Sequence, residues 1–145
     1  MREKEPAGVL RHPLIRELVA LDLPADDYVI FGSGPLLAHG IRTELGDLDL
    51  VARGSAWQRA EQTGTPCRGA VTGGLGYQFD GGRITVFPNW ISPDWDTDDL
   101  IDHAEVVDGL RFARLKDVLA YKQQLRRPKD VVDIRTIMRF VTEHR

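Results

Sequence analysis

Cysteine and long apolar runs are the scarcest features of this 145-residue sequence. It has a single cysteine, Cys67, and no run of apolar residues approaches the ~18 that a membrane-spanning helix needs. One cysteine excludes an internal disulfide and a cysteine-based zinc site, and the four histidines lack the spacing of metal ligands. The N-terminal stretch is charged and unlike a signal peptide. The sequence therefore predicts no membrane span, no zinc, and a cytoplasmic location.

An excess of positive charge is also absent. Lysine and arginine number 19 against 22 acidic residues, which gives a net charge of −3. A strongly basic nucleic-acid binder is therefore not the default interpretation, because phosphate neutralisation needs clustered cations. The hydrophobic content of 42% and the charged content of 28% are typical of a folded domain. We expect one domain over residues 1–145, with a sheet core at 28–113 and C-terminal helices at 114–145.

The pattern of apolar residues, glycines and prolines predicts an α/β or α+β fold: a mixed β-sheet flanked by helices, with a C-terminal helical pair. Residues 1–10 are expected to be loose, and residues 89–99 irregular. Helices are predicted at residues 12–21, 36–41, 55–63 (with Ser55 as N-cap), 115–125 and 128–143. Strands are predicted at residues 28–31, 48–52, 68–72, 76–79, 83–87, 104–107 and 110–112. Hairpin turns are expected at residues 80–82 and 108–109.

The most informative segment runs from residue 28 to 53. A buried strand ends in Gly32-Ser33, and a helix follows at once with Pro35 near its start. About fourteen residues after Ser33, a second strand carries Asp47-Leu48-Asp49. Residues i and i+2 of a strand face the same side, so the two carboxylates point together and repel each other unless a cation lies between them. Gly32 permits close backbone approach, and the Ser33 hydroxyl and the helix start offer donors to an anion such as phosphate.

Gly32-Ser33 followed by Asp47-x-Asp49 resembles the nucleotidyltransferase superfamily with the DNA polymerase β-like fold. The C-terminal segment and the hairpin before it are similar to those of small bacterial members of this family. The matching tail residues are Lys122, Arg127, Lys129, Asp130, Asp133 and Ile134. The resemblance covers most of residues 28–140.

This resemblance implies Mg²⁺-dependent (or Mn²⁺-dependent) transfer of a nucleoside monophosphate from a nucleoside triphosphate (NTP) to an acceptor. Asp47 and Asp49 would be the catalytic and metal-binding residues. The nucleotide-binding residues would be Gly32, Ser33, Gly34, Lys122 and Lys129. The acceptor is open between a small molecule, a protein and an RNA end, and the site could be completed by a homodimer or a partner protein.

One position departs from the family pattern. A third carboxylate usually lies on a later strand between hydrophobic residues, and here Thr85 occupies that place. A threonine hydroxyl is a poor metal ligand compared with a carboxylate, so the departure favours an alternative: a catalytically degenerate member that binds nucleotide or a partner, for example in a toxin–antitoxin or regulatory role. The candidate substitutes are the acids Asp80, Asp94, Asp96, Asp98 and Asp99.

Each candidate residue also has a purely structural interpretation. Asp47 can be a turn acid and Asp49 a partly exposed strand acid. Lys122, Arg127 and Lys129 can form a solvated helix face and a capping turn, and the Gly-Ser segment can simply connect a strand to a helix. A structural adaptor that binds no nucleotide is therefore a third hypothesis.

Overall fold

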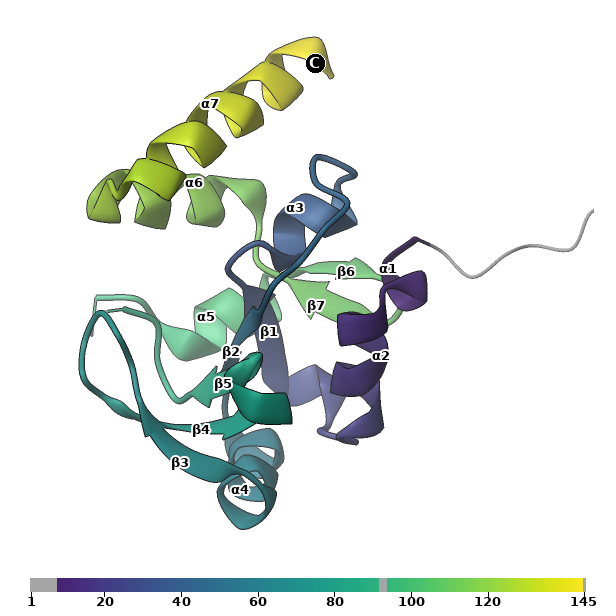
Figure 1. The fold of residues 1–145 in the computed structure, drawn as a ribbon, viewed down its shortest axis with the longest axis vertical. Helices are drawn as coiled ribbons and strands as arrows, with labels where there is room; N and C mark the ends of the chain where they lie inside the picture. Colours follow the sequence, from purple (N-terminus) through teal and green to yellow (C-terminus); the bar gives the residue numbers. More distant parts are fainter. Residues whose placement is uncertain (1–7, 92–93, 145) are drawn as a thin grey trace, which may run out of the picture.

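A seven-stranded mixed sheet forms the centre of the protein, in the order β3-β4-β5-β2-β1-β7-β6, with helices on both faces (Figure 1). The computed structural model describes residues 8–91 and 94–144. The strands are β1 (Tyr28–Phe31), β2 (Leu48–Ala52), β3 (Thr65–Arg68), β4 (Leu75–Phe79), β5 (Ile84–Phe87), β6 (Glu105–Val107) and β7 (Leu110–Phe112). The α-helices are α1 (Gly8–Arg11), α2 (Pro13–Ala20), α3 (Gly34–Ala38), α4 (Gly54–Thr63), α5 (Thr97–Asp102), α6 (Leu115–Leu125) and α7 (Pro128–Glu143). Two short 3₁₀ helices lie at Ala25–Asp27 and Asp80–Gly82.

The alternation of side chains along the strands divides the core into two layers. Tyr28 and Ile30 of β1 belong to a hydrophobic cluster that includes residues of α1, α2 and α4. Val29 and Phe31 belong to a second cluster that includes residues of α3, α5, α6 and α7. Successive residues of a strand point to opposite faces, so a strand buried on both sides reads as a continuous apolar run, as β1 does.

Two strand pairs position the candidate site. β1 is antiparallel to β2, with Phe31 opposite Asp49, and β2 is parallel to β5, with Asp49 opposite Thr85. The end of β1 therefore adjoins the beginning of β2, and the beginning of β2 adjoins the beginning of β5 on its other side. Helices α6 and α7 pack on each other beyond α3, at the end of the sheet where β1 ends (Figure 1). The mixed sheet, its flanking helices and the C-terminal helix pair confirm the predicted α/β architecture.

Several predicted elements are confirmed with the bounds expected. Strands β1 and β2 and helices α6 and α7 span the predicted residues, and antiparallel pairs are joined at residues 80–83 and 108–109. Asp108 and Gly109 both have positive φ, +53° and +82°. A two-residue turn with positive φ at both positions matches the twist of an antiparallel pair, which is why Asp-Gly predicted this hairpin.

The strand predicted at residues 68–72 is wrong. The strand is β3 (Thr65–Arg68), at the edge of the sheet, and residues 69–74 form the loop that joins it to β4. Gly73 has a φ of +72°, and its N–H donates to the carbonyl of Gly69, so this segment turns back on itself. Pro66 is compatible with this position, because an edge strand tolerates proline.

Other local predictions also need correction. Ser55 does not cap α4: the N-cap is Arg53, and the Ser55 hydroxyl instead donates to Asp27 Oδ2 at 3.1 Å. The segment expected to be irregular contains α5, whose N-cap Asp96 accepts from two backbone N–H groups. The loose segment expected at 1–10 lies mostly outside the described residues, and residues 8–10 belong to α1. Among the residues described, no helix is long and apolar enough to cross a membrane.

The buried face of α7 also differs from the predicted one. The helical spacing of Val131, Ile134, Met138 and Val141 in the sequence predicts that they form the apolar face of this helix, but the buried residues are Asp130, Asp133 and Ile137. Met138 and Val141 are 48% and 40% exposed. Two carboxylates take the buried positions because each finds a cationic partner there, as the candidate site shows.

Candidate functional site

The Gly-Ser turn lies directly beside the acidic strand. Phe31, the last residue of β1, is paired with Asp49, so the next residue, Gly32, passes close to the Asp49 carboxylate. Gly32 has a φ of +66°, and a Cβ at this position would lie 3.0 Å from Asp49 Oδ2. Glycine is therefore required twice here, once by the left-handed backbone and once by the close approach of the carboxylate.

Asp49 is a half-buried carboxylate at the edge of the core. Its neighbours in β2, Leu48 and Leu50, pack in the same hydrophobic cluster as α2. Because successive residues of a strand point to opposite faces, Asp49 projects toward the other face of the sheet, which α6 covers. Burial raises the pKa of the Asp49 carboxyl above its ordinary value; the hydrogen bond from Thr85 opposes this shift, and the negative charge of Asp47 adds to it. Asp47, two residues earlier, is exposed. The pair thus concentrates two negative charges that favour a cation.

Thr85 lies on β5, opposite Asp49 in the parallel pair β2–β5. Its Oγ1 donates a hydrogen bond of 2.7 Å to Asp49 Oδ1. The hydroxyl therefore contacts the acidic pair directly, as a donor to a carboxylate. The position that would bring a third carboxylate to this site is occupied by a neutral group.

A cavity of about 590 Å³ opens beside this acidic pair. It is lined by most of the residues singled out from the sequence, namely Gly32, Ser33, Asp47, Asp49, Lys122 and Lys129. Its apolar lining comes from residues of β4, β5, α6 and the connections around them, including Val71, Leu75, Phe87, Trp90, Ile91 and Leu125. A cavity of this volume that combines apolar walls with converging charged groups has the usual character of a small-molecule site.

A second hollow, of about 580 Å³, lies between residues 22–25 and helix α4. Its charged lining residues are Asp22 and Arg59, whose Oδ2 and Nη2 atoms lie 3.7 Å apart. Because these two charges offset each other, the hollow offers no unbalanced charge to a ligand. The first cavity is therefore the better candidate.

Gly34, predicted to bind nucleotide, lies outside the cavity and has a packing role instead. It is buried at the start of α3, outside the cavity lining, and a Cβ there would lie 2.4 Å from Ile30 Cγ2 and 3.5 Å from Leu48 Cδ2. A gap that small cannot hold a methyl group. The absence of a side chain at Gly34 lets α3 pack against β1 and β2.

Lys122 lines the cavity but is held by carboxylates. Its side chain is 3% exposed, and its Nζ lies 2.9 Å from Asp133 Oδ2 and 3.6 Å from Asp130 Oδ1. An ammonium group buried to this degree needs such partners, because its desolvation is costly. The three residues together bind α6 to α7, which explains why the buried face of α7 is acidic.

Arg127 and Lys129 follow at the α6–α7 turn. Arg127 donates from Nε and Nη2 to the two carboxylate oxygens of Asp130, at 2.6 and 3.1 Å, and its backbone N–H donates to Oδ2 at 3.0 Å. Burial alone would raise the pKa of Asp130, but these hydrogen bonds hold it below its ordinary value. Lys129 is exposed, and its positive charge lowers the pKa of Asp49.

Arg42 and Tyr121 are cavity residues that the sequence argument missed. Arg42 donates from Nη1 to Ser33 Oγ at 2.9 Å and from Nη2 to Asp133 Oδ1 at 2.6 Å. Tyr121 is buried beside the acidic pair, and burial together with the charge of Asp49 raises its pKa. Neither belongs to a local motif, so only the pairing of distant segments could have identified them.

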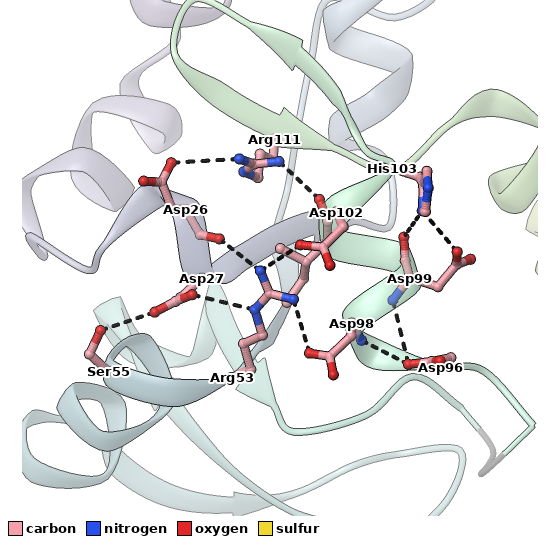
Figure 2. A network of polar contacts seen from close by, with 11 residues as sticks. Asp26, Asp27, Arg53, Ser55, Asp96, Asp98, Asp99, Asp102, His103 and Arg111 are labelled. Atoms are coloured by element: carbon pink, nitrogen blue, oxygen red, sulfur yellow. Dashed lines mark hydrogen bonds and ion pairs between the residues drawn. The ribbon is translucent and has the colours of Figure 1, made fainter.

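The acids after β5 do not complete the acidic pair. Figure 2 shows the Arg53 guanidinium between Asp27, Asp98 and Asp102, with distances of 3.3, 2.9 and 2.7 Å to their carboxylate oxygens. Arg53 follows the far end of β2 from Asp49. These contacts hold α5 against that end of the sheet and assign Asp98 to a structural network.

The remaining candidates for a third acid have other partners or positions. Asp96 caps α5, Asp99 contacts His103 (Figure 2), and Asp80 pairs with Arg83. None of these, nor Asp94, is among the residues that line the cavity. Within residues 8–91 and 94–144, no group of three or more histidine, cysteine or acidic side chains is arranged to hold a metal ion. The acidic site therefore has two carboxylates, Asp47 and Asp49.

In comparisons with known proteins, no family model, no curated protein and no solved structure matches this chain.

Proposed function

We propose that this protein is a nucleotidyltransferase of the DNA polymerase β-like fold, which transfers a nucleoside monophosphate from an NTP to an acceptor with the help of Mg²⁺ (or Mn²⁺). The observation that carries the proposal is the lining of one cavity by opposite charges: the acidic pair Asp47 and Asp49, and the cations Arg42, Arg127 and Lys129. A polyphosphate with a divalent cation matches this arrangement, since the cation needs oxygen ligands and the phosphates need positive charge.

The donor set fits magnesium. Mg²⁺ is commonly held by one or two carboxylates plus phosphate oxygens of the substrate, and Asp47 and Asp49 supply two carboxylates beside the cavity. When bound, the ion would supply charge neutralisation at the transferred phosphoryl group. Gly32 lets the backbone pass close to the Asp49 carboxylate, Ser33 offers a hydroxyl, and Arg127 and Lys129 offset phosphate charge. Because NTPs are cytoplasmic metabolites, the proposal includes a cytoplasmic location.

A second candidate function is favoured by the hydrogen bond from Thr85 to Asp49. In this alternative the protein is a degenerate member of the same fold that binds an NTP but does not transfer the nucleotide, and acts in a toxin–antitoxin or regulatory role. The hydroxyl occupies one oxygen of Asp49 and adds no negative charge. Nucleotide binding needs less charge compensation than stabilisation of a transition state, so the two-carboxylate site suits this role as well.

The first experiment measures thermal stability with ATP, GTP, CTP and UTP, each with and without Mg²⁺. We expect at least one nucleotide to raise Tm in a Mg²⁺-dependent manner, and the Asp47→Asn/Asp49→Asn double variant to lose that shift. The matched control is Asp98→Asn/Asp102→Asn, which removes two acids from the Arg53 network outside the cavity. If no nucleotide shifts Tm of the wild-type protein, both candidate functions are wrong.

A second experiment separates the two functions. Pyrophosphate release is measured with the nucleotide that binds, while small-molecule extract, RNA and protein fractions are supplied separately as acceptors. Release that needs one of these fractions and disappears in Asp49→Asn supports the transferase. Binding without release, together with release gained by Thr85→Asp, supports the degenerate alternative.

A further inference from the structure

Arg42 connects the Gly-Ser turn to the C-terminal helices. It lies in the connection between α3 and β2, where its backbone N–H donates to the Leu36 carbonyl at 3.2 Å. Its guanidinium reaches Ser33 Oγ with one terminal nitrogen and Asp133 Oδ1 with the other. The side chain is 39% exposed and lines the cavity. A guanidinium fixed at two points keeps a defined orientation and still has N–H groups to offer.

The direction of the Arg42–Ser33 hydrogen bond matters for the serine. Arginine can only donate, so Ser33 Oγ is the acceptor in this contact. The hydroxyl proton is then free to be donated elsewhere, and no acceptor for it is found among the residues that the structure describes. Arg42 and Ser33 therefore present neighbouring donors to the same part of the cavity.

The charges around Asp133 leave a positive surplus. Two carboxylates, Asp130 and Asp133, are shared by the cations Lys122, Arg127 and Arg42. Both oxygens of Asp130 accept from Arg127, while Asp133 divides its oxygens between Lys122 and Arg42. Since Lys122 is almost fully buried, the uncompensated charge is available to a ligand chiefly at Arg42.

The helix that follows Ser33 cannot supply this charge. Helix α3 has five residues, and the N–H groups of Leu36 and Leu37 both donate to the Ser33 carbonyl. A single turn aligns few peptide dipoles, so its contribution to anion binding is small. The positive charge expected beside Ser33 comes instead from a side chain nine residues later in the sequence.

We propose that Arg42 binds a phosphoryl group of a polyphosphate chain together with Ser33, and that Asp133 is the positioning residue that orients Arg42. This inference rests on the proposed function and deepens it, since it names the group that the basic side of the cavity recognises. Lys122, in contrast, stabilises the α6–α7 pair and supports Asp133.

The test uses inorganic tripolyphosphate, which carries the phosphates without a base or ribose, in isothermal titration with Mg²⁺ present. We expect Arg42→Gln to weaken binding about 10-fold or more, since hydrogen bonds between charged groups are the strongest polar contacts. Arg42→Lys keeps the charge but cannot span both partners, and should recover only part of the affinity. The matched control is Arg139→Gln, which removes an exposed arginine of α7 outside the cavity and should bind like wild type.

Asp133 is tested by a double-mutant cycle. If it acts through Arg42, Asp133→Asn weakens tripolyphosphate binding in the wild-type background but adds no further loss in the Arg42→Gln background. Equal losses in both backgrounds would overturn the positioning role. Unfolding is followed for every variant; should Asp133→Asn fail to fold, Arg42→Gln and Arg42→Lys still decide whether Arg42 binds phosphate.

The outcomes separate this inference from the proposed function. Mg²⁺-dependent NTP binding that is unchanged in Arg42→Gln overturns the inference and leaves the proposed function intact. Tripolyphosphate binding that needs Arg42 but neither Mg²⁺ nor the acidic pair supports the inference and contradicts the proposed function. Wild-type protein that binds neither tripolyphosphate nor any NTP overturns both.

Discussion

Thr85 Oγ1 donates to Asp49 Oδ1 at 2.7 Å across the parallel pair β2–β5. The contact joins a neutral hydroxyl to a carboxylate whose pKa burial has raised. The hydrogen bond favours the ionised form of Asp49 and so opposes the effect of burial. Thr85 therefore helps Asp49, the half-buried residue of an otherwise buried strand, to keep a negative charge beside the cavity.

The first prediction concerns removal of this donor. Thr85→Val, which keeps the shape of the side chain, should lower the free energy of unfolding by about 1–3 kcal/mol at pH 7, because Asp49 Oδ1 loses its partner. Urea denaturation measures the change. The matched control is Thr136→Val in α7: Thr136 Oγ1 donates only to the Val132 carbonyl of its own helix and is exposed, so the change should be within about 0.5 kcal/mol. Equal losses in the two variants would contradict the assigned role of Thr85.

The second prediction concerns the charge of Asp49. Its pKa is raised in the folded protein, so the folded state binds the proton more tightly than the unfolded chain, and stability falls as pH rises from the unfolded to the folded pKa. Asp49→Asn removes this ionisation. Without metal, the variant should therefore be more stable than the wild type at pH 7.

The difference between Asp49→Asn and the wild type should shrink as the solution is acidified, since Asp49 is protonated in both states below its unfolded pKa. Urea denaturation in a chelating buffer, at several pH values from 4 to 8, measures it. Asp98→Asn is the control, because Asp98 lies in the Arg53 network outside the cavity. A variant that is less stable than the wild type at pH 7 would show that the Asp49 charge is well compensated in the folded protein.

The sequence predicted the acidic side of the site better than the basic side, for a physical reason. Gly32 directly follows β1, and Asp49 and Thr85 lie on the neighbouring strands β2 and β5, so the strand ends and the period of two determine which of these residues meet. The antiparallel β1–β2 pair and the parallel β2–β5 pair then bring these positions together. Local sequence patterns were sufficient to identify these three residues, because each lies in a predicted strand or next to the end of one.

The basic side depends on contacts between distant segments. Arg42 and Asp133 are 91 residues apart in sequence, and no periodicity indicates that they meet. The apolar pattern of α7 also predicted the wrong buried face, since it treats carboxylates as surface residues. Asp130 and Asp133 are buried because Lys122 and Arg127 offset their charges, and such pairing is visible only in three dimensions.

The third prediction separates the structural lysine from the exposed one. Lys122→Met should lower the free energy of unfolding by about 3–5 kcal/mol, because it leaves Asp133 and Asp130 buried without one of their cationic partners. Lys129→Met, the same substitution seven residues later at an exposed position, should change it by no more than about 0.5 kcal/mol. Urea denaturation of both variants at pH 7 tests the contrast. A small loss of unfolding free energy for Lys122→Met would indicate that Lys122 is not part of the structural network. Lys122 would then again be a candidate for binding the ligand.

The last prediction concerns the contact between Gly32 and Asp49. Gly32 and Gly40 both have positive φ, +66° and +73°, but only a Cβ at position 32 would meet another group, Asp49 Oδ2 at 3.0 Å. Gly32→Ala and Gly40→Ala should each lose about 1–2 kcal/mol of stability from the left-handed backbone. Gly40→Ala thus serves as a control for the backbone effect alone.

Only Gly32→Ala should change the Asp49 carboxyl. The added methyl group displaces water from Oδ2 and deepens the burial of the charge, so the pKa of Asp49 should rise further than in the wild type. Carbon-detected NMR titration of the aspartate side chains in the metal-free protein measures this pKa in all three proteins. An identical Asp49 titration in Gly32→Ala and Gly40→Ala would mean that the carboxylate moves away without cost, and that the glycine at position 32 serves the turn and not the acidic pair.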